Sequence, residues 1–196
     1  DMSPLMQVAL RSGIAALLVG AVMWWRGERM SLRDGTFGPG AVVGSLFALE
    51  YLLVGFGMQL TSASHMVVFL YTAPLFAALF TRFFLGEHVA LHTWLAIGVA
   101  ALGIMVVFAG AFSASDLTGN GYALLSSAAV GANLTLLRRH PTMERMPLIA
   151  LGGLMAALIA WPNAQPFGLG SSSYWVLALM GLIQMPLATL LINNAT

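Results

Sequence analysis

The chain has 196 residues, of which 59% are hydrophobic and only 8% are charged, against about 25% charged in soluble domains, so lipid rather than water must surround most of it. Cysteine is absent, which excludes disulfide frameworks, thiolate metal sites and cysteine nucleophiles. The eight basic residues are all arginine and form no basic stripe, so the small net charge of +1 gives no reason to expect a nucleic-acid partner.

Seven apolar stretches have the length needed to cross a bilayer or come near it. A helix that spans the hydrocarbon core takes about 20 residues, because its backbone polar groups must be satisfied within the segment. In chain order the stretches are residues 4–25, 39–60, 65–86, 91–112, 118–137, 146–161 and 173–192. The sequence therefore predicts an all-α membrane protein, a polytopic bundle with seven transmembrane helices.

The arginines predict the orientation of this bundle, because short cytoplasmic loops collect arginine and exported loops do not. Seven of the eight lie on alternate connections, namely Arg26, Arg29, Arg33, Arg82, Arg138, Arg139 and Arg145. The connections at 61–64, 113–117 and 162–172 hold none. We expect the arginine-bearing connections to face the cytoplasm, and we expect a multi-pass protein of a bacterial cytoplasmic membrane from its alanine-rich, lysine-free composition.

The two ends of the chain and a weak internal sequence repeat indicate how the chain is organised. Asp1 leads almost directly into a helix, and the chain stops at Thr196 just after the seventh stretch, so we expect this chain to be part of a longer protein. The pattern PL at 4–5 and IAALL at 14–18 returns as PL at 147–148 and MAALI at 155–159. These stretches are the first and sixth, so the topology predicts that they run in opposite directions, as in an inverted repeat.

Three runs in a fixed order resemble EamA-type permeases of the drug/metabolite transporter superfamily: TSASH at 61–65, LYTAPLFAAL at 70–79 and FLGE at 84–87. Residues 94–110 are similar to that family's fifth helix, and residues 119–139 resemble the opening of its second repeat. The resemblance implies ten helices in two inverted five-helix repeats, with the substrate passing between them by alternating access. On that map residues 1–115 supply helices two to five, and residues 116–196 supply helices six to eight of a truncated second repeat.

Two charged residues lie within predicted membrane helices, where a charge is costly unless it faces a partner or a cavity. Arg11 lies about 10 Å below the external end of the first stretch, and Glu50 about 15 Å below that of the second. We predict either an Arg11–Glu50 pair or a shared water-filled vestibule in the substrate pathway. The alternative is that Arg11 reaches the headgroups and that Glu50 hydrogen-bonds another helix.

Four further residues complete the predicted substrate pathway. Pro74 interrupts the third stretch, so we expect a mid-helix kink there with Tyr71 one turn before it; the alternative is a kink that serves packing alone. Asn133 and Gln184 are uncharged polar residues at membrane depth, and either could contact substrate or join helices by hydrogen bonds.

Small residues four positions apart predict seams of close helix packing. The pairs are Gly40/Gly44, Ala96/Ala100, Ser127/Gly131 and Gly152/Ala156. Their number favours a compact monomeric bundle, and any of them could instead serve the face of a homodimer.

No motif for hydrolysis, nucleotide binding or a cofactor is present in the sequence. His88 and His92 have the i,i+4 spacing of a zinc site on one helix face, but Val89 follows His88 where such a site needs Glu, so we expect no metal. Three classes of function remain. We rank a secondary transporter above a receptor or assembly subunit and above an intramembrane enzyme. We expect this transporter to export small metabolites such as amino acids or drug-like compounds. Protons or the substrate gradient would supply its energy.

Overall fold

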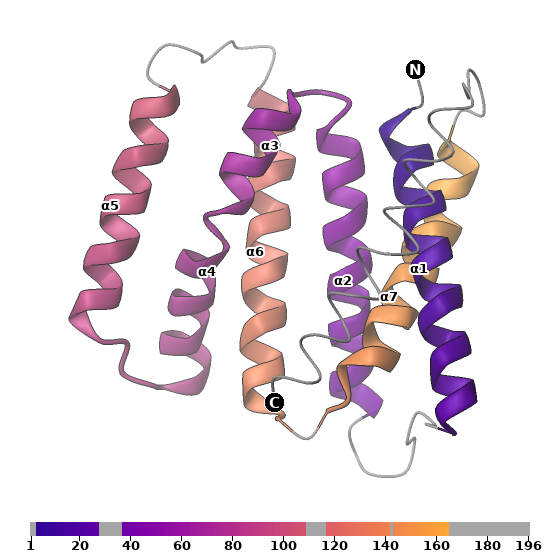
Figure 1. Ribbon diagram of the computed structural model, residues 1–196. Coiled ribbons are helices and arrows are strands. Elements are labelled where there is room, and N and C mark those ends of the chain that lie inside the picture. Colours follow the sequence, from indigo (N-terminus) through magenta and orange to yellow (C-terminus); the bar gives the residue numbers. More distant parts are fainter. Residues whose placement is uncertain (1–2, 28–36, 109–116, 142, 165–196) are drawn as a thin grey trace.

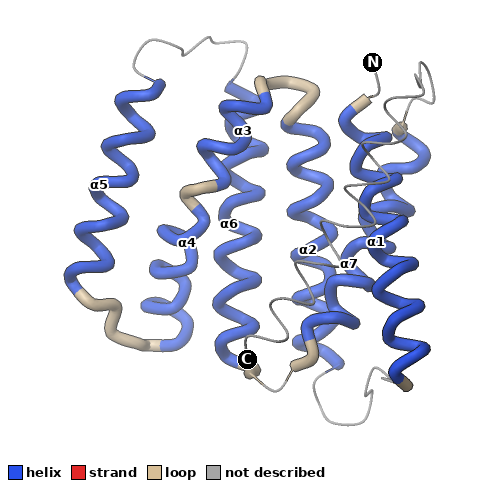
Figure 2. The backbone as a smooth tube through the Cα atoms, viewed as in Figure 1, coloured by secondary structure: helices blue, strands red, loops and turns tan. Residues whose placement is uncertain are grey.

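The computed structural model describes residues 3–27, 37–108, 117–141 and 143–164, and all regular elements in these ranges are helices (Figures 1 and 2). They are α1 (Pro4–Arg26), α2 (Phe37–Gly57), α3 (Ala63–Leu70), α4 (Ala73–Phe80), the π-helix η1 (Thr81–Leu85), α5 (Leu91–Phe108), α6 (Leu117–Arg139), α7 (Arg145–Ala160) and the 3₁₀ helix η3 (Trp161–Asn163). The predicted all-α membrane fold is confirmed. The first six predicted stretches coincide with these helices, and the seventh, 173–192, lies outside the described residues.

Among the described residues, four segments are long and apolar enough to cross a membrane: Pro4–Trp25, Gly38–Gly57, Ala63–Leu85 and Met146–Asn163. Helix α5 contributes a shorter apolar stretch, Leu91–Gly103. Helix α6 has 23 residues, which is long enough to span, but it carries buried serine, threonine and asparagine side chains that lower its hydropathy. Such a helix is suited to the interior of a bundle, because its neighbours shield its polar groups from lipid.

The ends of α1 show why the chain turns where it does. Ser3 caps the start, where its hydroxyl accepts a hydrogen bond from the Met6 backbone N–H at 3.3 Å, and Pro4 occupies the first turn, where its missing N–H costs nothing. The helix ends at Gly27, whose φ of 69° lies in the left-handed region that favours glycine. Gly86 ends η1 in the same way, with a φ of 69°.

Successive helices along the chain run in opposite directions, except that α4 continues the direction of α3, and the helices stand side by side in a row (Figure 1). Helix α1 packs against α7, α7 against α2, α2 against α6, and α6 against α3 and α4. Helix α5 stands apart at the edge of the row, with open space around Gly98 and Gly103. The helix ends at Arg26, Arg139 and Arg145, together with η1, which contains Arg82, all lie at one end of the bundle, here named the arginine end, as the arginine pattern predicts.

Glycines bring the central helices into backbone contact, because a side chain at these positions would meet a neighbour. A Cβ added to Gly152 of α7 would lie 2.7 Å from the Gly44 carbonyl oxygen of α2. One added to Gly131 of α6 would lie 2.5 Å from the Phe76 Cβ of α4. Three of the four predicted seams are thus confirmed. The prediction for Ala96/Ala100 is wrong within the described residues, because both alanines are exposed on α5.

The third membrane segment is broken rather than kinked. Helix α3 ends at Leu70, a turn follows at Tyr71 and Thr72, and α4 begins at Ala73 with Pro74 in its first turn. The prediction of Pro74 in mid-helix is therefore wrong: proline at a helix start has no hydrogen bond to lose. The Thr72 hydroxyl donates to the Phe69 carbonyl oxygen at 2.7 Å, so it accepts its 2.7 Å bond from the Ser127 hydroxyl of α6.

Candidate functional site

Polar side chains gather where α1, α2 and α7 meet. Arg11 of α1 places its guanidinium carbon 5.9 Å from the ring centroid of Tyr51 of α2, within the range of a cation–π interaction. Glu50 precedes Tyr51 on the same helix, and both it and Arg11 are half-buried. The structure thus brings together the two charged residues that the sequence places in the membrane.

Arg11 and Glu50 attract each other electrostatically but form no direct ion pair within the described ranges. The predicted direct pair is therefore not formed, because the Arg11 guanidinium lies over the Tyr51 ring instead. The Arg11 Nε is buried and has no hydrogen-bond partner among the described residues. A shared water-filled vestibule around the two charges stays a prediction.

Ser12, the next residue of α1, is a buried polar residue that sequence reasoning missed. Ser12 is 1% exposed, and its hydroxyl has no hydrogen-bond partner in the part of the chain that the structure describes. The Ser12 backbone carbonyl lies against α7, where a Cβ added to Gly153 would approach it to 2.9 Å. Because serine is common in membrane helices and often bonds its own backbone, its type alone gave no signal.

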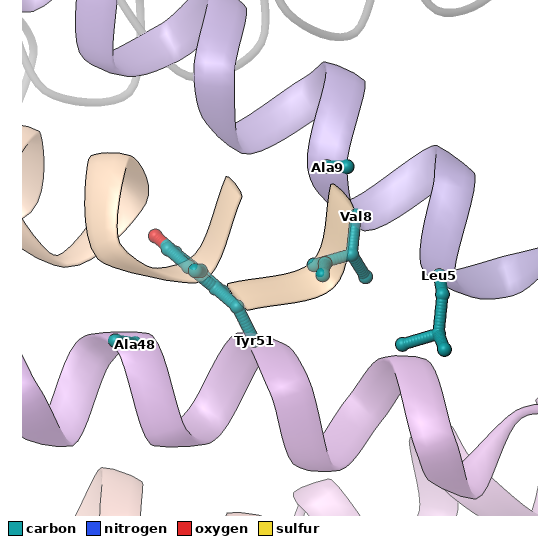
Figure 3. Packing of buried hydrophobic residues seen from close by; sticks show 7 residues of the cluster. Leu5, Val8, Ala9, Ala48 and Tyr51 are labelled. Carbon is teal, nitrogen blue, oxygen red and sulfur yellow. The ribbon is translucent and has the colours of Figure 1, made fainter. Parts of the chain in front are cut away.

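An apolar cluster packs beside these polar groups. It comprises Leu5, Val8 and Ala9 of α1, Ala48 and Tyr51 of α2, and Ala156 and Ala160 of α7. Figure 3 shows Leu5 and Val8 extending from α1 toward α2, and Tyr51 extending from α2 toward α7. The alanines let the three helices approach closely, so the charges are held in a surrounding of low polarity, where electrostatic forces are stronger than in water.

Helix α6 extends the polar groups along a second interface. The Ser126 hydroxyl donates to the Glu50 backbone carbonyl at 3.3 Å, which fixes α6 against α2 beside the site. Asn133 lies seven residues, or two turns, further along this face. It is 2% exposed, and neither amide atom has a hydrogen-bond partner among the described residues. Asn133 is thus buried within the bundle but apart from the Arg11 site, and its place in a substrate pathway stays a prediction.

The remaining predicted pathway residues do not join the site. Tyr71 is 75% exposed at the break between α3 and α4, and Pro74 is exposed beside it. Thr72, between them, is the residue that contacts α6. Gln184 lies outside the described residues.

The arginine end carries the charged contacts of the loops. Arg138 at the end of α6 pairs with Glu87 at 2.6 Å, although both side chains are exposed, and Arg82 contacts His88. His88 lies in the loop before α5, so it does not share a helix face with His92. The prediction of a common face is wrong.

An apolar groove of about 290 Å³ opens between α1 and α7. It is lined by positions 16–23 of α1 and 147–154 of α7, so it begins one helical turn beyond Ser12 and runs toward the arginine end. The polar site therefore lies at one end of an apolar groove.

The sequence of the chain was compared with those of known proteins and protein families. The sequence model described as the EamA-like transporter family matches residues 1–109. A Bacillus subtilis (strain 168) protein named "Uncharacterized transporter YdfC" is 33% identical over 72 residues, which cover 37% of this chain and 22% of that protein. No solved structure matches the chain significantly. Because the family model covers more than half of its residues, the chain belongs to the EamA-like transporter family.

Proposed function

We propose that the chain is part of a secondary transporter that exports small metabolites, such as amino acids or drug-like compounds, across a bacterial cytoplasmic membrane. The family and the transporter name of its Bacillus subtilis relative support transport in general. The observation that carries the proposal is the Arg11–Glu50–Tyr51 site within an apolar bundle. Its partners are the lipid bilayer and the transported molecule.

The cost of the two charges is the reason to assign them a function. A charged side chain at the centre of a membrane helix costs about 2.5–3.5 kcal/mol on insertion scales, and a direct ion pair would offset part of this. Arg11 and Glu50 make no such pair within the described ranges. Ionisable residues inside membrane helices are rare and typically mark substrate and ion pathways.

The contact between α1 and α7 supports alternating access by two inverted repeats, with residues 1–115 in the first and 116–196 in the second. The two helices are antiparallel, and they approach closely at Gly13, where an added Cβ would lie 3.5 Å from the Ala157 Cβ, and at Gly153. These positions lie near the middle of the two segments that share the PL and AAL patterns. Helices related by an in-plane two-fold axis would cross at such equivalent positions.

Protons are the coupling ion that we propose, because Glu50 is an acid inside the bundle. Within the described residues, the charged or titratable groups that interact electrostatically with Glu50 are Arg11 of α1 and Tyr51, the next residue of α2. Helix α6 contributes the uncharged Ser126. A carboxyl group in this position can exchange a proton during transport, whereas an amide cannot.

Glu50→Gln tests the proposal, with Glu87→Gln as the matched control because Glu87 lies in an exposed loop at the arginine end. Membrane vesicles that contain the whole transporter, of which this chain is proposed to be part, are loaded with a radiolabelled amino-acid panel, and efflux is measured from pH 5 to pH 8. Glu50→Gln is expected to lower efflux at least tenfold and to abolish its pH dependence, while Glu87→Gln keeps both. Unchanged efflux and pH dependence in Glu50→Gln would remove proton coupling, and no efflux from the unaltered transporter would contradict transport.

A further inference from the structure

Arg82, in η1 at the arginine end, is a cation without a negatively charged partner among the described residues. Its side chain is exposed, and its guanidinium group contacts Nδ1 of the His88 ring. A guanidinium group can only donate hydrogen bonds, so His88 Nδ1 accepts and the proton of the neutral ring lies on Nε2. The two side chains therefore offer further N–H donors side by side, and neither supplies a negative charge.

The acid that lies nearest in the sequence, Glu87, is already engaged. Its carboxylate pairs with Arg138 of α6 at 2.6 Å, which joins the loop before α5 to the end of α6. Arg139, the next residue of α6, is exposed and adds another positive charge. Within the part of the chain that the structure describes, the positive charge of Arg82 is therefore not balanced by an ion pair.

The sequence shows the same excess of positive charge over the whole arginine end. The three connections that the arginine pattern assigns to this end, residues 26–38, 81–90 and 138–145, contain seven arginines and four acidic residues. The connections assigned to the opposite end contain Asp116 and no arginine. A negatively charged partner is thus favoured at the arginine end and disfavoured at the other.

A row of aromatic side chains leads from Arg82 along α4. Phe84, Phe80 and Phe76, here named the phenylalanine row, are spaced four residues apart, and their rings are in contact. The ring centroids of Phe80 and Phe84 are 5.8 Å apart, and those of Phe76 and Phe80 are 6.1 Å apart. Phe84 is 70% exposed and Phe80 is partly exposed, so the end of the row next to Arg82 is open to lipid.

Helix α5 leaves this surface uncovered, since it stands apart from α4 (Figure 1). Its first turns carry Leu91 and Leu95, which are also exposed, and they lie at the arginine end as Phe84 does. The loop that holds Glu87 and His88 connects the two apolar surfaces. Positive charge at the end of the bundle is thus continuous with an apolar surface along its side.

We propose that an anionic phospholipid binds here, with its phosphate at Arg82 and the Nε2–H of His88 and an acyl chain along the phenylalanine row. Arginine suits phosphate because its planar fork can donate two parallel hydrogen bonds, and basic sites at the cytoplasmic ends of membrane helices bind anionic headgroups. A zwitterionic phospholipid carries the same phosphate, but its own cationic group offsets the charge. The proposal does not depend on what the protein transports.

Lipid binding to the whole transporter, of which this chain is proposed to be part, tests the proposal in detergent micelles. Native mass spectrometry measures the binding of phosphatidylglycerol and of phosphatidylcholine with the same acyl chains. Phosphatidylglycerol is expected to bind about tenfold more tightly, since it keeps its full negative charge. Glycerol 3-phosphate, which has the phosphate but no acyl chain, is expected not to displace it.

Three variants assign the binding to the named groups. Arg82→Gln is expected to weaken phosphatidylglycerol binding about tenfold and to leave phosphatidylcholine binding nearly unchanged. Phe84→Ala is expected to weaken both lipids by about threefold, because the ring packs against the acyl chain of either. Arg139→Gln is the matched control, since it removes the same charge from an exposed position at the same end, outside the phenylalanine row.

Thermal unfolding of each variant without added lipid verifies that it is folded. Any of three results would rule out this site: equal binding of the two phospholipids, displacement of phosphatidylglycerol by glycerol 3-phosphate, or an effect of Arg82→Gln no larger than that of Arg139→Gln. The last result would mean that the arginine end attracts anionic lipid only through its overall charge. Efflux plays no part in this measurement, so failure of the transport proposal and failure of the lipid site are distinguishable.

Discussion

Single glycines set the distances between helices. Gly131 of α6 lies against the α4 backbone, and an added Cβ would come within 2.8 Å of the Ala77 nitrogen. A backbone atom cannot move aside as the end of a flexible side chain can, so any substituent at this position must push α4 away. Gly121, on the same helix, has open space where a Cβ would be added.

Gly131→Ala is therefore expected to destabilise the bundle by about 1–3 kcal/mol through overpacking. Gly121→Ala is the control, and it should be neutral or slightly stabilising because alanine favours helix more than glycine does. Unfolding of both variants in mixed detergent micelles gives the comparison. Equal stability of the two variants would contradict the close contact of α4 and α6.

The residues of the candidate site could be predicted where their side chains carry a charge, because a charge is costly in lipid. Arg11 and Glu50 could be identified because charge in a membrane helix is rare. The burial of Ser12 against α7 could not be predicted, because no local sequence pattern reports it. Tyr71 was named for its nearness to Pro74, yet it points away from the bundle and is largely exposed.

At the scale of elements, the break between α3 and α4 depends on a partner in another helix. Thr72 accepts a hydrogen bond from Ser127 of α6, and its own proton goes to Phe69. Ser127 is fully buried, so removal of Thr72 would leave its hydroxyl without this partner. Pro74 signalled an interruption in the sequence, but the place of the turn could not be predicted because Ser127 lies 55 positions away.

A double-mutant cycle with Thr72→Val and Ser127→Ala measures this contact. Each single change is expected to cost about 1 kcal/mol, and the two together less than their sum by about 0.6 kcal/mol, the average for hydrogen bonds between membrane helices. Thr118→Val, at an exposed position of α6, should be additive with Ser127→Ala. Additivity of Thr72→Val with Ser127→Ala would mean that the hydrogen bond does not hold the break.

At the scale of the whole molecule, hydropathy and arginine placement predicted most of the fold. The first six stretches are helical, and their arginine-bearing ends lie together (Figure 1). Which helices pack on one another was not predictable, because the order α1–α7–α2–α6 joins segments far apart in the chain. The separate position of α5 could not be predicted either, because its apolar side chains can contact lipid as well as other helices.

The central claim is that these helices cross a membrane in alternating directions with the arginine end in the cytoplasm. Glu144 and Asn163 test it most directly, because they flank α7 at opposite ends, are both exposed, and can be changed to cysteine in a chain that has none. In intact cells, a membrane-impermeant maleimide is expected to label Asn163→Cys at once and Glu144→Cys only after the membrane is permeabilised. Labelling of both from the same side, or recovery of the chain in the soluble fraction, would contradict the account.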